Sequence, residues 1–535
     1  MAQAAKPAPA GKSPRKRSSG PAPLTRFNPA RGEVIGEIQS TDPREVANVV
    51  AQTRKVAPEW AAIAPEGRAR IMREVRYRIY DRLDEIVETV ATECGKPRLE
   101  ALTHDAMPTA LQLLYFERVA AKVLAPERAG RLLGPLVGSS SRIEWRPFGV
   151  VGAITPWNYP VMNCFLAFSS ALFAGNTVVI KPSEVTPGVG ELIRDLLEPL
   201  PPGVATVIQG GGDVGGALVD APCDKISFIG SPATGRRICE AAAKHLTPVV
   251  MELGGRDASV VCADADLDYA SSGVLWGSFY NAGQTCCSIE RTYVVDSVAD
   301  EFTDKLLTKL AQVRQVEGGE LGPLTFGRQF EIVERHVNDA VAKGARLLAG
   351  GPDAGRTNEN GSLWYAPTVI EGVTEEMDVI KEETFGPVVS LIRVRDEDEA
   401  VRRANEEGVN LTASVWTRNP KRAERIASQL RAGTVTVNDH GDTAGAPWTP
   451  WGGVGESGFG RLNGKLGLRE FVVPVHVATN TSTRMKKLWW YPYDEATTAT
   501  FRAATRVLTS SSLAGKAKEI PGLVQNAVAS LKKKL

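Results

Sequence analysis

Short apolar runs alternate with segments of helical period from Val150 onward. Five runs rich in β-branched residues are predicted strands: 150–155, 177–181, 205–209, 225–230 and 248–253. Helices are expected between them, including residues 188–198 and 234–245. This alternation is typical of a doubly wound parallel sheet.

A second series of strands and helices follows the first. Its predicted strands are residues 291–295, 388–394, 412–417 and 433–438, and residues 42–125 are predicted to be mostly helical. The expected fold class is therefore α/β, and 535 residues favour two or three domains.

Residues 147–180 contain no charged side chain, which by hydropathy alone could indicate a membrane span. Prolines, asparagines and a glycine interrupt the stretch at positions 156, 158, 160, 163, 175 and 176. We therefore expect a buried strand, a loop, a core-facing helix and a second buried strand.

The net charge of +1 is unevenly distributed along the chain. Residues 1–23 carry five basic residues and no acidic one, and residues 481–535 carry ten basic and three acidic residues, so residues 24–480 hold −11. An acidic body argues against nucleic-acid binding, whereas the tails could contact an anionic surface. The first tail is predicted to be disordered.

Seven cysteines without a disulfide framework, and no signal-peptide pattern, predict free thiols in a reducing, cytoplasmic compartment. The five histidines are scattered singly and no CxxC occurs. No metal site is expected.

The stretch "NAGQTCCSIER" places Cys286 and Cys287 side by side after Gly283. Only one of two consecutive thiols can point into a cleft. A reactive cysteine is one interpretation, and an inert core cysteine is the commoner one for a motif standing alone.

Two further motifs change that balance. Glu252 ends an apolar strand before Gly-Gly, at the edge where a parallel sheet opens into a ligand crevice, so it could act as a general base with a raised pKa. Asn158 lies in "TPWNYP", where two prolines could fix its amide as an oxyanion donor. The alternatives are a surface or capping glutamate and an ordinary turn asparagine.

Three stretches are candidates for dinucleotide contacts. "IKPSE" carries Lys181 and Glu184, which could contact ribose hydroxyls or form only an exposed ion pair. "FIGSPATGR" opens a helix after Gly230 and Ser231, where backbone N–H groups can hold a pyrophosphate. "KEETFGPVVS" places Glu383 and Phe385 before a strand.

Together these stretches resemble the aldehyde dehydrogenase superfamily, from about Phe27 to Val477. Glu-Leu-Gly-Gly at 252–255 and "FYNAGQTCCSIER" match its two signatures, with 34 residues between Glu252 and Cys286. The resemblance implies a Rossmann-like cofactor domain, an α/β catalytic domain and a small β oligomerisation element.

The resemblance also implies a role for each matching residue. Cys286 would be the nucleophile, Glu252 the general base and Asn158 the oxyanion-hole side chain, with Cys287 packing or lining the tunnel. Trp448 and Trp451 would lie near that tunnel. The implied cofactor contacts are Thr155, Pro156, Trp157, Lys181, Ser183, Glu184, Gly230, Ser231, Gly235, Leu253, Glu383 and Phe385.

The activity implied is oxidation of an aldehyde to the carboxylic acid through a cysteine thiohemiacetal and a thioester. Glu252 favours hydrolysis over transfer to coenzyme A, and Glu184 favours NAD, with NADP tolerated. An apolar aldehyde is the expected substrate. The alternatives are a semialdehyde dehydrogenase, a coenzyme A-acylating relative and an inactive binding protein on the same fold.

The expected domains follow the same resemblance. Residues 24–127 and 149–253 would bind the cofactor, and residues 254–470 would form the catalytic domain. Residues 128–148 and 471–480 would pair subunits into a homodimer or homotetramer. Residues 481–535 form a basic extension with an aromatic start and an amphipathic end, which could lie on an anionic membrane or pack against protein.

Overall fold

The computed structural model describes residues 20–130, 139–352, 360–406, 410–441, 444–480, 486–491 and 493–534. Most of the predicted disordered tail, residues 1–19, lies outside the described residues, as do 131–138 and 481–485. The chain divides into two compact units. One comprises residues 1–124 and 146–473, and the other 125–145 and 474–535.

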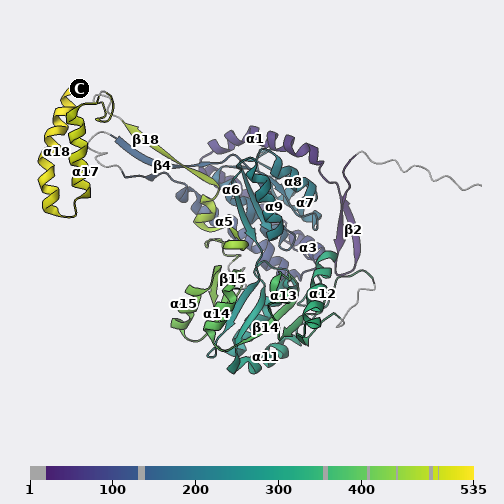
Figure 1. Ribbon diagram of the computed structural model, residues 1–535. Coiled ribbons are helices and arrows are strands. Elements are labelled where there is room, and N and C mark those ends of the chain that lie inside the picture. The colour runs from purple at the N-terminus through teal and green to yellow at the C-terminus, as the bar shows by residue number, and fades with distance from the viewer. Residues whose placement is uncertain are drawn as a thin grey trace, which may run out of the picture. The chain divides into compact units, whose positions relative to one another are not determined.

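The larger unit holds a six-stranded sheet in the order β17-β9-β8-β5-β6-β7 (Figure 1). Its parallel strands are β5 (Val150–Ile154), β6 (Thr177–Lys181), β7 (Ala205–Val207), β8 (Lys225–Gly230) and β9 (Val249–Leu253). The short β17 (Gly458–Phe459) adds antiparallel to β9. All five strands predicted for this series are confirmed.

Helices cover this sheet. Apolar side chains of α1 (Val46–Ala62), α8 (Gly212–Asp220) and α9 (Pro232–Ala243) share one core cluster with β5, β6, β8 and β9. Helix α6 (Pro160–Ala174) contacts β5, β6 and β8, and every one of its residues is buried. The uncharged stretch is therefore core, as expected. No described helix combines the length and apolar character needed to cross a bilayer.

The remaining helices near the first sheet include α7 (Pro187–Leu196), which follows β6. Residues 42–125 form α1, α2 (Pro65–Asp81), α3 (Leu83–Cys94), α4 (Arg98–Glu100), a π-helical turn (Ala101–Ala106) and α5 (Met107–Val123), as predicted. A separate ribbon precedes them, made of β1 (Leu24–Asn28) and β2 (Glu33–Ile38).

A seven-stranded sheet forms the second layered part of the same unit, in the order β12-β13-β14-β11-β10-β15-β16. Its strands are β10 (Asp257–Val261), β11 (Ile289–Val295), β12 (Arg346–Ala349), β13 (Thr368–Glu371), β14 (Val388–Val394), β15 (Asn410–Trp416) and β16 (Ala432–Val437). All pair in parallel except β12. Helices α10 to α15 lie in this part of the chain.

The sequence missed three strands of this sheet: β10, β12 and β13. β10 begins four residues after β9 ends, and the chain changes sheets between them. A break of three residues is easily mistaken for a bend within one strand, so the pattern did not separate the two.

The smaller unit contains a three-stranded sheet in the order β18-β4-β3, from β3 (Glu127–Arg128), β4 (Ser139–Pro147) and β18 (Val472–Asn480). The strands expected at 128–148 and 471–480 therefore lie side by side. Two helices follow, α17 (Glu495–Thr509) and α18 (Leu513–Lys534), packed together as a hairpin (Figure 1).

Candidate active site

The loop that carries the cysteine pair is held in an unusual backbone conformation. Asn281, Ala282 and Gly283 have φ values of 52°, 54° and 70°. A Cβ on Gly283 would lie 2.0 Å from the carbonyl oxygen of Gly386. Only glycine permits this approach, which places the cysteine loop against the loop that carries Glu383 and Phe385.

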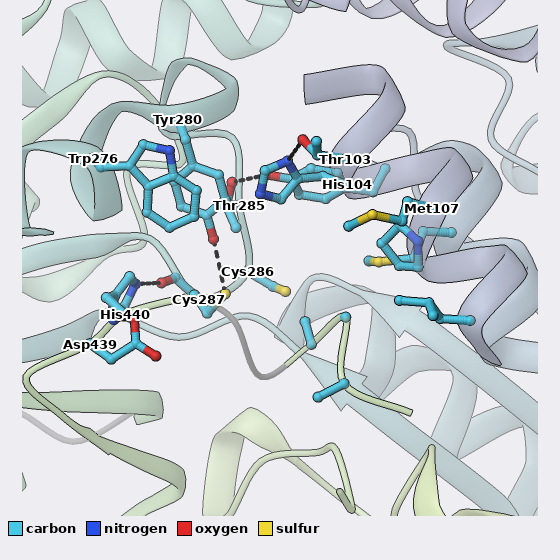
Figure 2. A pocket seen from close by; sticks show the side chains of 18 of the residues that line it. Thr103, His104, Met107, Trp276, Tyr280, Thr285, Cys286, Cys287, Asp439 and His440 are labelled. Carbon is cyan, nitrogen blue, oxygen red and sulfur yellow. Dashed lines mark hydrogen bonds between the residues drawn. The ribbon is translucent and has the colours of Figure 1, made fainter. Parts of the chain in front are cut away.

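The two neighbouring sulfurs point in different directions (Figure 2). Cys287 is 1% exposed, and its sulfur lies 3.2 Å from the Tyr280 hydroxyl. Cys286 lines two separate cavities, one polar and one largely apolar, and Cys287 lines the apolar one. Of the two thiols, Cys286 is therefore the one that lies at both cavities.

The polar cavity, of about 490 Å³, opens where β5, β6, β8 and β9 end. This is the carboxyl edge at which open α/β sheets bind ligands. Eleven predicted residues line it: Pro156, Trp157, Asn158, Ser183, Glu184, Gly230, Ser231, Glu252, Cys286, Glu383 and Phe385.

Four predicted cofactor residues do not line this cavity. Lys181 is buried and its ammonium lies 3.0 Å from the Glu184 carboxylate, which places it behind that residue. Gly235 faces Leu253, where a Cβ would lie 2.7 Å from the leucine side chain, so this pair brings α9 against β9. Thr155 is buried, with its hydroxyl 2.9 Å from the Cys164 sulfur.

Asn158 is fixed by three hydrogen bonds. Its backbone carbonyl accepts from the Lys96 ammonium at 2.5 Å and from the Asn281 amide at 3.1 Å. Its side-chain oxygen accepts from Asn163 at 2.9 Å. The side-chain NH₂ therefore remains to face the cavity, as an oxyanion donor must.

Lys96 was not singled out in the sequence. It is fully buried, pairs with Asp105 at 3.0 Å, and lies 3.9 Å above the centre of the Tyr159 ring. Asp105 also accepts from the backbone N–H groups of Val161 and Met162 at the start of α6. The Lys96–Asp105 pair joins the Asn158 turn to the start of α6. The local sequence around Lys96, Gly-Lys-Pro, could not predict this role because Asn158 and α6 are distant from it in the chain.

Glu252 is 2% exposed, and burial raises its pKa to about 7. Hydrogen bonds from the Cys286 thiol and the Trp451 indole partly offset that shift. The Trp451 Nε1 lies 3.2 Å from the carboxylate. Trp448 and Trp451 were both expected near the substrate tunnel. Trp448 lines it, whereas Trp451 does not and is buried against the proposed base.

The pKa of Cys286 is raised by the adjacent Cys287 thiol, by burial and by the Glu252 carboxyl. Glu252, with a pKa of about 7 and in contact with the Cys286 thiol, is placed to take its proton.

Glu383 and Phe385 are positioned by Glu290, which the sequence analysis also missed. The Glu290 carboxylate accepts from the backbone N–H groups of Thr384 and Phe385, each at 2.9 Å. These bonds hold Phe385 at a φ of 52°, a conformation uncommon for a bulky residue. The Phe385 ring meets Trp157 edge to face at 5.6 Å.

The cavity offers suitable groups for a dinucleotide. One oxygen of the buried Glu383 carboxyl has no hydrogen-bond partner among the described residues, and it can accept from a ribose hydroxyl. Ser231 caps α9 by accepting from the Thr234 N–H, and Pro232 has no N–H, so Ala233 is the residue of this first turn whose N–H can face a phosphate at the cavity wall.

The second cavity, of about 480 Å³, is the tunnel shown in Figure 2. Aromatic and aliphatic side chains dominate its wall: Met107, Pro108, Leu111, Tyr159, Met162, Trp276, Tyr280, Ala444, Ala446 and Trp448. Trp276 and Tyr280 stack with centroids 4.2 Å apart. Its described wall holds no lysine or arginine, and Asp439 is its one carboxylate.

A cleft at the carboxyl edge of a doubly wound sheet, meeting an apolar tunnel at Cys286, is the arrangement expected of a nucleotide-dependent oxidoreductase of carbonyl compounds. Residues 16–477 match the model of the aldehyde dehydrogenase family. The chain belongs to the aldehyde dehydrogenase family, and it is accordingly an NAD(P)-dependent oxidoreductase acting on aldehydes.

Named relatives span nearly the whole chain. A "4,4'-diapolycopene aldehyde oxidase" of Methylomonas sp is 37% identical over 88% of each chain. A Mycobacterium ulcerans (strain Agy99) protein, "Putative succinate-semialdehyde dehydrogenase (NADP(+)) 2", is 36% identical over 84% of this chain and 87% of its own.

A solved structure gives the same result for the fold. PnpE from Pseudomonas sp. WBC-3 aligns with a TM-score of 0.83 at 30% identity, covering 88% of this chain and 96% of PnpE. A structure of PnpE in complex with nicotinamide adenine dinucleotide aligns equally well.

Proposed function

We propose that the chain oxidises an apolar aldehyde to its carboxylic acid, with Cys286 as the nucleophile. The observation that carries this proposal is the position of Cys286, at the junction of the polar cleft and the apolar tunnel. An aldehyde entering through the tunnel and a dinucleotide in the cleft would both reach the same sulfur.

The first chemical step is attack of the Cys286 thiolate on the aldehyde carbon, after Glu252 has taken the thiol proton. The oxyanion that forms accepts hydrogen bonds from the Asn158 NH₂ and from a backbone N–H of the cysteine loop. A nicotinamide bound in the cleft supplies the acceptor for the hydride that leaves this carbon. A thioester on Cys286 results.

Hydrolysis of the thioester is assigned to Glu252. A carboxyl with a pKa of about 7 is divided between its two protonation states at neutral pH, so it can accept a proton from water and release it. Because Glu252 can activate water, the proposal favours the free acid over a coenzyme A thioester.

We propose NAD as the preferred cofactor. Glu184 lies at the cleft, and a carboxylate beside the ribose would repel a 2′-phosphate. The neighbouring Lys181 ammonium neutralises part of that charge, which would leave NADP usable at lower efficiency.

The tunnel wall favours an apolar substrate over a carboxylate-bearing semialdehyde. Binding a substrate carboxylate in a buried site requires a cation or several hydrogen-bond donors. The described tunnel wall provides no lysine or arginine. The name of the Methylomonas relative, an oxidase of a polyene aldehyde, agrees with this preference, whereas that of the mycobacterial relative supports the semialdehyde alternative.

A panel of aldehydes tested with NAD and NADP in parallel decides between these substrates. We expect kcat/KM to rise with the length of the apolar chain and to be at least about tenfold lower for succinate semialdehyde, a difference of about 1.4 kcal/mol. A preference for the semialdehyde would reject the apolar assignment.

The same assay tests the nucleophile. Cys286→Ala should abolish formation of reduced cofactor. The control Cys239→Ala, at a partly exposed thiol of α9, should retain activity. Equal activity of both variants would remove Cys286 from the mechanism, and no activity of the unaltered protein with any aldehyde would favour a binding protein.

We also propose a cytoplasmic enzyme that works as a homodimer or homotetramer through β4 and β18, and that contacts a membrane peripherally through residues 481–535. The support is the pairing of β4 with β18 in one small sheet and the basic charge of the extension.

A further inference from the structure

The C-terminal hairpin has an interior of small and polar residues. Its fully buried positions, among the described residues, are Thr497, Thr500, Ala503 and Ser530. The Thr497 and Ser530 hydroxyls lie 2.5 Å apart, and an ion pair between Arg506 and Glu519 at 3.7 Å also joins the two helices. Small residues and hydroxyl contacts are typical of helices that pack within lipid.

Large apolar side chains lie on the outside of the same hairpin. We call this group the outer set: Phe501, Leu508, Leu513, Ile520, Val524 and Val528. Leu508 is 67% exposed and Leu513 is 86% exposed. The amphipathic stripe expected from the sequence ran through Leu523, Ala527, Leu531 and Leu535, with Val524 and Val528 beside it. Of these, Val524 and Val528 are exposed, Leu523, Ala527 and Leu531 are half-buried, and Leu535 lies outside the described residues.

This arrangement differs from a helix pair stabilised in water, which buries its large apolar side chains: Leu523 and Leu531 are only half-buried, and the outer set is exposed. Leu513, Ile520, Val524 and Val528 recur at seven- and four-residue spacing, so they share one face of α18, and an exposed apolar face of this kind marks an interaction site. The outer set therefore needs a partner, and its surroundings indicate which.

Aromatic residues extend the outer set toward the start of α17. Trp489, Trp490, Tyr491 and Tyr493 are each more than half exposed, and the Trp489 ring meets Phe501 at 6.5 Å. Tryptophan and tyrosine are enriched where a membrane meets water, because they combine an apolar ring with a polar group.

Basic residues accompany the aromatic ones. Residues 481–535 carry a net charge of +7, and the exposed described cations include Lys486, Arg502, Arg506, Lys518 and Lys532. An anionic lipid surface attracts each such cation with about 1 kcal/mol near the surface. The charge of the hairpin thus complements anionic headgroups, while the outer set complements acyl chains.

We propose that the hairpin of α17 and α18 docks on an anionic membrane, with the outer set inserted at the boundary between headgroups and acyl chains. Helix α18 carries Lys516, Lys518 and Glu519 within its length, so the proposed position of the hairpin is in the interface and not across the bilayer. This inference rests on the proposed peripheral membrane contact and on the apolar substrate. The docked enzyme would be concentrated where aldehydes of lipid-soluble compounds partition.

The test is co-sedimentation of the full chain with two kinds of vesicle. One is phosphatidylcholine alone, and the other is phosphatidylcholine in which about 30% of the lipid is the anionic phosphatidylglycerol. We expect binding to the anionic vesicles. The partition coefficient should be at least about tenfold smaller on neutral vesicles, and also in about 0.5 M salt, where the screening length lies between about 3 and 10 Å. Equal binding to both vesicle types would overturn the role of charge.

A double variant tests the outer set directly. Val524→Glu/Val528→Glu should reduce the partition coefficient by about tenfold or more, since it replaces inserted apolar groups by charges. The matched control is Val316→Glu/Val341→Glu, which places the same charges at two valines of similar exposure in the larger unit. Equal loss in both double variants would overturn the proposal.

Two further measurements separate this inference from the proposed function. Both double variants should oxidise a short, water-soluble aldehyde at the rate of the unaltered protein. An enzyme that oxidises apolar aldehydes but never sediments with vesicles would overturn the docking alone. Vesicle binding without oxidation of any aldehyde would overturn the proposed function alone. A change in native mass on Val524→Glu/Val528→Glu, without vesicle binding, would assign the outer set to a second copy.

Discussion

At the scale of single residues, the proposed chemistry depends on a buried carboxyl whose ionisation is costly. Glu252 has a pKa of about 7 in the folded protein, against about 4.5 for an exposed glutamate. The folded state therefore binds a proton that the unfolded chain releases. Below pH 4.5 the ionisation of Glu252 does not change the free energy of unfolding. Between pH 4.5 and pH 7 it lowers the free energy of unfolding progressively, by about 3 kcal/mol in all.

Glu252→Gln is expected to lower kcat about 100-fold or more, because it removes a general base. It should also remove the rise of kcat with pH that we expect near pH 7, where the carboxylate forms. Trp451→Phe is the companion variant. It removes a hydrogen bond that stabilises the carboxylate, so the inflection should move to higher pH. Steady-state pH profiles measure both, and an unchanged profile in Glu252→Gln would assign the base elsewhere.

At the scale of elements, the site depends on the contact of two loops from different parts of the second sheet region. The cysteine loop precedes β11, and the loop with Glu383 and Phe385 precedes β14. The close approach of Gly283 to Gly386 and the bonds from Glu290 join these loops. The same contacts therefore fix the position of the Cys286 thiol relative to Glu383 and Phe385, the proposed nicotinamide contacts.

Gly283→Ala should weaken this contact. The new Cβ would clash with the carbonyl oxygen of Gly386. In addition, the positive φ costs about 1–2 kcal/mol for a residue that has a side chain. We expect a lower midpoint of denaturation in urea and a raised KM for NAD. Gly216→Ala, on α8 with open space around its position, is the control: it should keep the KM for NAD and leave the midpoint of denaturation unchanged or raise it, because alanine favours a helix interior over glycine. Indistinguishable variants would contradict the assigned role of Gly283.

At the scale of the whole molecule, the small sheet has an edge suited to pairing between copies. β18 is its outermost strand, it is nine residues long, and most of it is partly or fully exposed. Its neighbour β4 contributes Ser141, whose hydroxyl lies 2.5 Å from the His476 ring. A long exposed edge strand favours addition of another strand.

Light scattering of the full chain should therefore give two or four times the 57.4 kDa mass of one chain. Val475→Pro, which removes an N–H from β18, should shift the protein toward the single-chain mass. A single-chain mass for the unaltered protein at micromolar concentrations would reject the proposed pairing.

The sequence predicted the strands of the first sheet with errors of one or two residues, because these strands are buried runs of β-branched residues between helices. The position of Glu252 at the end of a buried parallel strand predicted that it would lie at the edge of the sheet. The roles of Cys286, Asn158, Glu184 and Glu383 were implied by the resemblance of their motifs to a known family. Each of these residues lies in a short sequence motif that can be recognised without knowledge of the fold.

The tertiary structure decided what no local pattern contains. Lys96, Glu290 and Trp451 act on Asn158, Phe385 and Glu252 through contacts between residues distant in the chain. Their roles follow from burial, which turns ordinary polar residues into hydrogen-bonding partners that must be satisfied. The hairpin of α17 and α18 gives the same lesson: amphipathicity was visible in the sequence, but only packing determined which side chains remain outside.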